Sequence, residues 1–135
     1  MTRYAFEVPG KPCAKARPRM TRNGRAYTPE KTVNAETAIR LTAQAQGVTP
    51  LKGPIEMRVV AVFPVAKSWT KSRREAALKG APHVSRPDAD NIGKLVGDAL
   101  NGIAYDDDAQ VYDCHVRKVY GPEPKTLVFI YDEEG

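Results

Sequence analysis

Six aspartates lie between residues 86 and 111, in the stretch RPDADNIGKLVGDALNGIAYDDDAQV, with Lys94 as the single internal base. They are Asp88, Asp90, Asp98, Asp106, Asp107 and Asp108. If the last three fold back on the first two, carboxylates about 5 Å apart repel by roughly 3 kcal/mol per pair at an effective dielectric constant of 20. A bound cation would relieve that repulsion. Oxygen ligands without His or Cys beside them favour Mg²⁺, or Mn²⁺ as a substitute, over Zn²⁺. The stretch therefore predicts a magnesium site.

A helix must position most of these carboxylates, and the pattern predicts one from Asn91 to Asn101, ended by Gly102. Its apolar residues recur at helical spacing: Ile92, Leu95, Val96, Ala99 and Leu100. At about 100° per residue, the opposite arc carries Asp90, Lys94, Asp98 and Asn101. Pro87 disfavours helical backbone at the residue before it, and Asp90 is a good N-cap. We therefore expect an extended Asp88–Asp90 segment whose two carboxylates converge at the helix start.

A purely structural interpretation of the same residues is also open. Asp90 would cap the helix, Asp88 would interact favourably with the helix dipole, and Lys94 would pair with Asp98. This interpretation leaves the crowding of the three later aspartates unexplained. Asp98 lies about 12 Å along the helix from Asp90, too far for both to bind one ion. We expect Asp98 to pair with Lys94 or to support the metal ligands without touching the ion.

The 135 residues predict one domain, residues 1–135, with a single core. No apolar run approaches membrane-spanning length, and the first residues lack a signal-peptide pattern. We therefore expect a cytoplasmic protein with no membrane partner. Cys13 and Cys114 are the only two cysteines, too few for a disulfide framework, and they lack metal-ligand spacing. Both are therefore expected to be reduced thiols.

Charge is divided unequally along the chain. Residues 1–80 hold 16 basic and 5 acidic side chains, a net +11, whereas residues 81–135 hold 5 and 11, a net −6. The basic half contains an acid-free run, residues 11–27, whose two prolines and Gly24 favour a loop. A solvated basic loop is one interpretation and a phosphate-binding arm is the other. In the second case the DNA-binding residues are Lys11, Lys15, Arg17, Arg19, Arg22 and Arg25.

The remaining elements follow from periodicity and turn signals. Alternation predicts strands near residues 4–8, 54–65, 110–120 and 126–131. The last two strands are expected to form an antiparallel hairpin through Gly121–Pro124. Thr28 as N-cap and Pro29 in the first turn predict a scaffold helix ending at Gly47, and a short helix is expected at residues 69–79. We expect an α+β fold: a mixed, mainly antiparallel sheet with helices packed against it.

Five further residues carry weaker signals. Trp69 favours a core anchor over a stacking platform for a base. His83 and His115 have no nucleophile or metal ligand near them in the sequence, so structural or surface roles are expected. Gly93 and Gly97 each cost about 1 kcal/mol relative to Ala in a helix, which indicates a close approach of DNA or of another backbone.

The pattern PDADN, then Lys94, DAL and DDAQV, resembles the RusA-type Holliday junction resolvases, with their D-x-D-N-x-x-K helix followed by a D-D-x-Q strand start. The match is specific over residues 86–111 and looser at VPGKP and the RPR of residues 17–19. The resemblance implies that Asp88, Asp90 and Asp108 bind the metal and that Lys94 is the catalytic lysine. Asp107 would then be the first aspartate of the D-D-x-Q motif and would support the metal ligands without binding the ion.

The function that the resemblance implies is a Mg²⁺-dependent endodeoxyribonuclease that resolves four-way DNA junctions by paired symmetric nicks. Two symmetric cuts need two sites and this sequence has one acidic site, so we expect a homodimer bound to branched DNA. A protein that binds branched DNA without cutting it is the alternative. A D-x-D motif can also hold the metal diphosphate of a nucleotide sugar, but no nucleotide-binding fold is evident in so short a chain.

Overall fold

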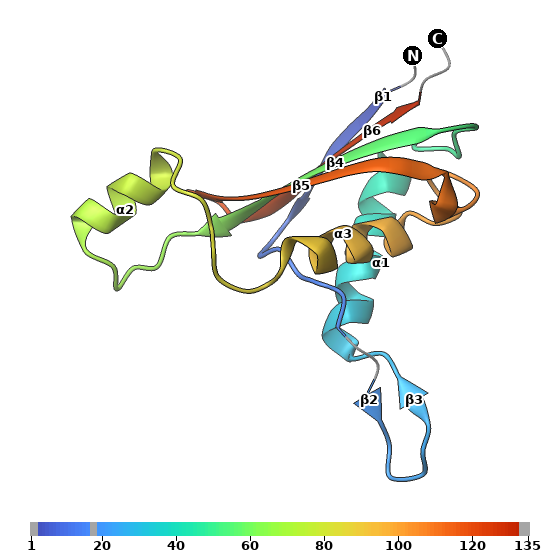
Figure 1. Ribbon diagram of the computed structural model, residues 1–135, viewed down its shortest axis with the longest axis horizontal. Helices are drawn as coiled ribbons and strands as arrows, with labels where there is room; N and C mark the ends of the chain where they lie inside the picture. Colours follow the sequence, from blue (N-terminus) through green and yellow to red (C-terminus); the bar gives the residue numbers. More distant parts are fainter. Residues whose placement is uncertain (1–2, 17–18, 133–135) are drawn as a thin grey trace.

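The computed structural model describes residues 3–16 and 19–132. Helices α1 and α3 cover one face of a four-stranded sheet, α2 lies at one end of the sheet, and a small hairpin, β2–β3, projects beyond α1 (Figure 1). The strands are β1 (Arg3–Pro9), β2 (Arg19–Met20), β3 (Ala26–Tyr27), β4 (Ile55–Pro64), β5 (Val111–Gly121) and β6 (Lys125–Asp132). The helices are α1 (Glu30–Ala45), α2 (Lys71–Leu78) and α3 (Ala89–Ala99), with a 3₁₀ turn at Asp108–Gln110. The predicted α+β class is confirmed.

The sheet has the strand order β1-β6-β4-β5. β6 runs antiparallel to β1 and to β4, whereas β4 and β5 are parallel, so the sheet is mixed and mainly antiparallel, as predicted. The predicted hairpin of the last two strands is wrong, because β4 lies between them. Gly121 pairs with Pro64 on one side of β4, and Lys125 pairs with Val62 on the other. The three residues between Gly121 and Lys125 span two strand spacings, about 10 Å, and thus cross the end of β4.

The core lies between the sheet and helices α1 and α3. Alternate residues of β4 are buried, as the alternation of a strand requires: Ile55, Met57, Val59, Ala61 and Phe63. So are the five apolar residues predicted for α3: Ile92, Leu95, Val96, Ala99 and Leu100. Helix α1 instead buries Thr32, Glu36, Ile39 and Ala43, while its apolar Val33 and Leu41 are exposed. The buried side of α1 thus includes two polar residues, Thr32 and Glu36.

Two helix starts differ from expectation. The N-cap of α3 is Asp88, and Asp90 is the second residue of the helix, so the predicted Asp90 cap and extended Asp88–Asp90 segment are wrong. The carbonyl of Asp88 accepts the N–H of Ile92 at 3.1 Å, which is the first hydrogen bond of the helix. The helix therefore begins directly after Asp88, the residue that follows Pro87. Helix α1 similarly begins after Pro29, one residue later than predicted, and ends before Gly47 as expected.

None of the helices formed by the described residues combines the length and the apolar character needed to cross a bilayer. Cys13 and Cys114 are free thiols, as predicted.

Candidate active site

A pocket of about 530 Å³ lies between α3 and β5 and brings together residues from the two ends of the acidic stretch. Its ionisable lining residues are Asp90, Lys94, Asp98, Asp108 and Cys114, and the others are Met57, Ala89, Gly93, Gly97, Val111 and Val116. Asp90 and Lys94 come from successive turns of the exposed side of α3, and Asp108 comes from the turn that leads into β5. The fold therefore places three of the predicted catalytic residues around one cavity.

The two glycines of α3 allow the helix to lie close to its own sheet. A Cβ atom on Gly93 would lie 3.2 Å from Val116 Cγ2 and 3.7 Å from Cys114 Sγ. A Cβ atom on Gly97 would lie 3.8 Å from the hydroxyl of Tyr105, which donates a hydrogen bond of 2.7 Å to the Gly97 carbonyl. The neighbours of the two glycines are thus side chains of the same chain, tight at Gly93 and in ordinary contact at Gly97, whereas the predicted approach of DNA or of another backbone stays a prediction.

The backbone of the acidic tract is held by two amide side chains. Gln110 Oε1 accepts the N–H groups of Asp106 and Asp107 at 2.9 and 3.0 Å, and its Nε2 donates to two carbonyls of the loop before β4. Asn101 Oδ1 accepts the N–H of Asp108 at 3.1 Å. Gln110 was visible in the sequence as part of the D-D-x-Q motif, but its role as a clamp was not, because its partners lie in a distant loop.

The three aspartates of the tract have three different environments. Asp106 pairs with Lys52 at 2.8 Å. Asp107 caps the 3₁₀ turn by accepting the N–H of Ala109 at 2.9 Å. Asp108 lines the pocket. Of the three, only Asp108, the residue implied as a ligand, lines the pocket.

The site holds an excess of negative charge: three carboxylates line the pocket beside one cation, Lys94, and Asp98 is paired with Lys15. A hydrogen bond shared with Asp107 raises the pKa of Asp108 above its ordinary value, and desolvation and the charges of Asp107 and Asp98 add to this shift. Within the described ranges, no ion pair involves Asp88, Asp90 or Asp108. A carboxylate whose pKa is raised by neighbouring carboxylates, as that of Asp108 is, gains from a bound cation.

Asp98 pairs with Lys15 and not with Lys94, so that predicted pair is wrong. Lys15 Nζ lies 2.6 Å from Glu36 Oε1 and 3.3 Å from Asp98 Oδ2. Its backbone N–H also donates to the Asn91 carbonyl at 2.9 Å. The hydrogen bond with Glu36 is the main cause of the raised pKa of Lys15. Partial burial of the ammonium group lowers the pKa, and the hydrogen bond with Asp98 raises it further. Lys15 therefore fixes the amino-terminal segment against α1 and α3. The spacing of residues along α3 could not reveal that Lys15 is the partner of Asp98.

Asp88 lines a second, adjoining pocket of about 820 Å³ between the amino-terminal segment and the start of α3. The cations lining it are Lys11, Lys15, Lys31 and Arg86. Within the described residues, Asp88, Asp90 and Asp108 do not form a group whose ligand oxygens all lie within 4.8 Å of one another. Asp88 directly precedes Ala89, which lines the first pocket, but Asp88 itself lines the second pocket, among basic side chains.

Part of the predicted basic loop forms the β2–β3 hairpin, which projects from the body of the molecule (Figure 1). Its turn is closed by the N–H of Thr21 donating to the Arg25 carbonyl at 2.8 Å, with Gly24 at φ +76°. Arg22 and Arg25 are exposed on this hairpin. The predicted contacts of Arg17 and of the Arg19 side chain lie outside what the structure describes.

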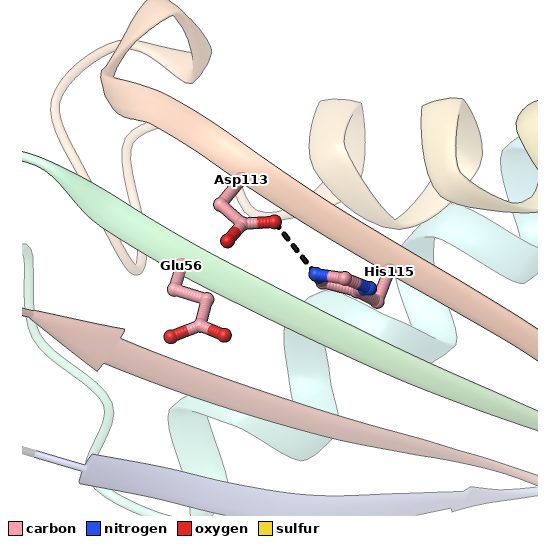
Figure 2. Close-up of side chains that lie close together, drawn as sticks. All are labelled: Glu56, Asp113 and His115. Atoms are coloured by element: carbon pink, nitrogen blue, oxygen red, sulfur yellow. Dashed lines mark ion pairs between the residues drawn. The ribbon is translucent and has the colours of Figure 1, made fainter.

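A second group of potential ligands lies on the other face of the sheet: Glu56, Asp113 and His115 (Figure 2). Their ligand atoms lie within 4.8 Å of one another. However, Glu56 Oε1 is 2.8 Å from Arg58 Nη2, and Asp113 Oδ1 is 2.8 Å from His115 Nε2. Each carboxylate therefore already has a partner. His115 is exposed, consistent with the surface role expected for it.

Comparison with known proteins gives two matches that cover nearly the whole chain. Residues 9–131 match the family model described as endodeoxyribonuclease RusA. A curated relative, the uncharacterised protein YqaN of Bacillus subtilis (strain 168), is 39% identical over 132 residues, which cover 93% of each chain. The matched range contains both pockets and the basic segment.

Proposed function

Because the chain belongs to the RusA endodeoxyribonuclease family, we propose that it is a Mg²⁺-dependent enzyme that resolves four-way DNA junctions by paired symmetric nicks. The observation that carries the proposal is the unbalanced group of carboxylates beside Lys94 in the pocket between α3 and β5. Family membership supports the class of reaction. The pocket contains carboxylates and a lysine of the kinds that this reaction would need. Mn²⁺ is the expected substitute for Mg²⁺.

The donor chemistry of the site fits a hard divalent cation. Asp90 and Asp108 offer carboxylate oxygens in one pocket, and Asp88 precedes the same helix turn. Burial raises the pKa of the Cys114 thiol, so this neighbour stays protonated and is a poor ligand. Asp88, Asp90 and Asp108 would hold the ion. When bound, it would supply an activated water and stabilise the charge of the reacting phosphate.

Lys94 is suited to the other catalytic task. It lies four residues after Asp90, about 6 Å along α3, and is exposed at the same pocket. Its ammonium group would orient the attacking water or neutralise charge that develops on the phosphate. Asp98 and Asp107 would act as supports: Asp98 by holding Lys15, and Asp107 by crowding Asp108 and capping the turn.

The basic surface next to the site would bind the substrate. Lys11 and Arg86 line the pocket of Asp88, and Arg22 and Arg25 extend on the hairpin. Contacts from these cations to phosphates would position the junction without reading its sequence. Arg17, Arg19 and Lys15 stay predicted contributors. A homodimer would give two sites for the near two-fold symmetric junction, and a cytoplasmic enzyme would have access to DNA.

The direct test compares a synthetic four-way junction with a linear duplex of the same sequence. We expect symmetric nicks in the junction with Mg²⁺ or Mn²⁺, none with a chelator, and much weaker cutting of the duplex. Tight junction binding without any nicking in either metal would instead support the non-catalytic, branched-DNA-binding alternative. Sedimentation of the chain at micromolar concentration, with and without the junction, tests the homodimer; only monomer in both samples would contradict it.

A further inference from the structure

The segment around α2 forms a second basic surface that the predicted site does not use. Residues 67–79 hold five basic side chains and one acidic one, a net charge of +4. In Figure 1, α2 lies at one end of the molecule, the β2–β3 hairpin projects elsewhere, and α3 lies between them. The candidate active site is thus placed between two separate basic projections.

Three of these cations line one groove of about 440 Å³ between α2 and the ends of β4 and β5. Lys71 and Arg74 are three residues apart in α2 and therefore lie on one side of the helix, and Lys67 joins them from the turn that precedes it. The rest of the lining is Pro64, Val65, Glu75, Leu78, Gly121 and Pro122. Glu75 is 4.0 Å from Lys71, a weak and exposed ion pair, so the groove keeps an excess of positive charge.

The helix that carries these cations is anchored by aromatic contacts. Trp69 packs edge-on against Tyr120 of β5, with ring centroids 5.3 Å apart, and the guanidinium of Arg73 lies 3.8 Å over the Trp69 ring. Thr70 caps the helix by accepting the Arg73 N–H at 3.2 Å. Trp69 therefore anchors α2 against β5, but it is half-buried at the end of the sheet and does not lie in the core as predicted. Arg73 is used in this anchor, whereas Lys67, Lys71 and Arg74 remain available to a ligand.

The connection from α2 to α3 is also fixed to the sheet. The His83 ring stacks on Phe63 with centroids 3.8 Å apart, and the His83 N–H donates to the Lys118 carbonyl at 3.2 Å. Lys118 Nζ donates to the carbonyls of Ser85 and Pro87, at 2.6 and 2.8 Å. Pro87 immediately precedes Asp88. The groove and the start of α3 are thus tied to the same strand, β5, and hold a set relative position.

We propose that the α2 groove binds the sugar–phosphate backbone of a duplex arm of the branched substrate, away from the cleaved phosphate. This inference rests on the proposed function and adds a second contact to it. Exposed lysine and arginine side chains match phosphates, and the proline and leucine side chains match the apolar edge of the sugars. A branched molecule sends arms in different directions, so two basic surfaces on either side of the site would favour it over a linear duplex.

The test is the salt dependence of junction binding by Lys71→Gln combined with Arg74→Gln, measured with a chelator so that no cutting occurs. The logarithm of the binding constant should fall less steeply with the logarithm of salt concentration, by about 1.8 for two lost phosphate contacts. Affinity for the linear duplex should change less than affinity for the junction. The matched control, Arg58→Gln with Arg117→Gln, removes two exposed charges from the outer face of the sheet and should leave the slope within error.

The charge-retaining variant, Lys71→Arg with Arg74→Lys, should restore the slope, which excludes misfolding as its cause. An unchanged slope in the Lys71/Arg74 glutamine variant would overturn the inference, as would an equal loss in the control. These outcomes are separate from the nuclease proposal. A wild-type chain that binds the junction through the groove but never nicks it would contradict only the proposed function.

Discussion

The two carboxylate groups that flank β5 differ in how their charge is balanced. On the outer face, Glu56 is paired with Arg58, and Asp113 is hydrogen bonded to the imidazole of His115. In the pocket under α3, the neighbouring carboxylates raise the pKa of Asp108. The outer group has the shorter mutual distances and the inner group has the unbalanced charge.

This difference indicates that proximity alone does not identify a metal site. Glu56, which already has the cationic partner Arg58, gains little from an ion, because the ion must first displace that partner. Crowded carboxylates gain from any cation that reduces their repulsion. We therefore propose that the metal binds in the pocket under α3, although its three predicted ligands are not gathered in a group of short distances.

The largest expected effect comes from Asp90→Asn or Asp88→Asn. Loss of a ligand should reduce junction cleavage by at least about a hundredfold, because even residues that only orient ligands cost 10–100-fold. Junction binding should survive, since the basic surface is intact. The matched change on the outer group, Asp113→Asn, should leave the cleavage rate within about twofold. Full cleavage by either of the first two variants would remove them from the metal site.

Lys15→Met should lower the free energy of unfolding by about 2 kcal/mol at pH 7, because buried Glu36 loses its closest charged partner. Since folding raises the pKa of Lys15, its stabilisation is complete below the ordinary value of 10.5 and is lost as pH rises through the raised value. Chemical denaturation of both proteins should therefore show a constant difference from pH 7 to 9 and a smaller one above 10.5. No difference at pH 7 would mean that this pair is not structural.

Asp98→Asn should reduce cleavage by about tenfold, less than Asp90→Asn, because Asp98 supports Lys15 and is not expected to touch the ion. Dependence of the rate on Mg²⁺ concentration is the informative measurement. The midpoint should hardly move for Asp98→Asn. A midpoint shift as large as that of a ligand variant would place Asp98 with the metal ligands.

The smallest effect concerns the two glycines of α3. Gly97→Ala should raise the free energy of unfolding by up to about 1 kcal/mol, because its new methyl group meets the Tyr105 hydroxyl only at 3.8 Å. Gly93→Ala should gain less, since its methyl group would lie 3.2 Å from Val116 Cγ2. Thermal unfolding of the Gly97→Ala and Gly93→Ala variants shows which substitution stabilises the protein more. The reverse order would show that α3 is packed differently against β5.

Much of this site could be predicted from the sequence because its signals are local. The burial of one side of α3 and the exposure of Lys94 on the other follow from spacing within eleven residues. The clamp of Gln110 on the loop before β4 and the pairing of Lys15 with Asp98 could not be predicted. These contacts join segments far apart in the chain, and one charged residue can pair with many others.

The errors at strands and caps have a related origin. The hairpin expected after β5 failed because a turn of three residues is compatible both with neighbouring strands and with a crossing over β4. The cap of α3 was placed at Asp90 because both aspartates beside Pro87 suit an N-cap, and only the backbone hydrogen bond from Ile92 to Asp88 distinguishes them. Local patterns gave the elements, whereas their partners depended on tertiary structure.

The central claim, that the metal binds under α3, is tested most directly by the broadening of backbone amide NMR signals with Mn²⁺, recorded in the presence of a junction that cannot be cut. We predict that broadening centres on Asp88, Asp90 and Asp108 and disappears in Asp90→Asn, while Asp113→Asn leaves it unchanged. Broadening centred on Glu56, Asp113 and His115, and lost in Asp113→Asn, would contradict the assignment.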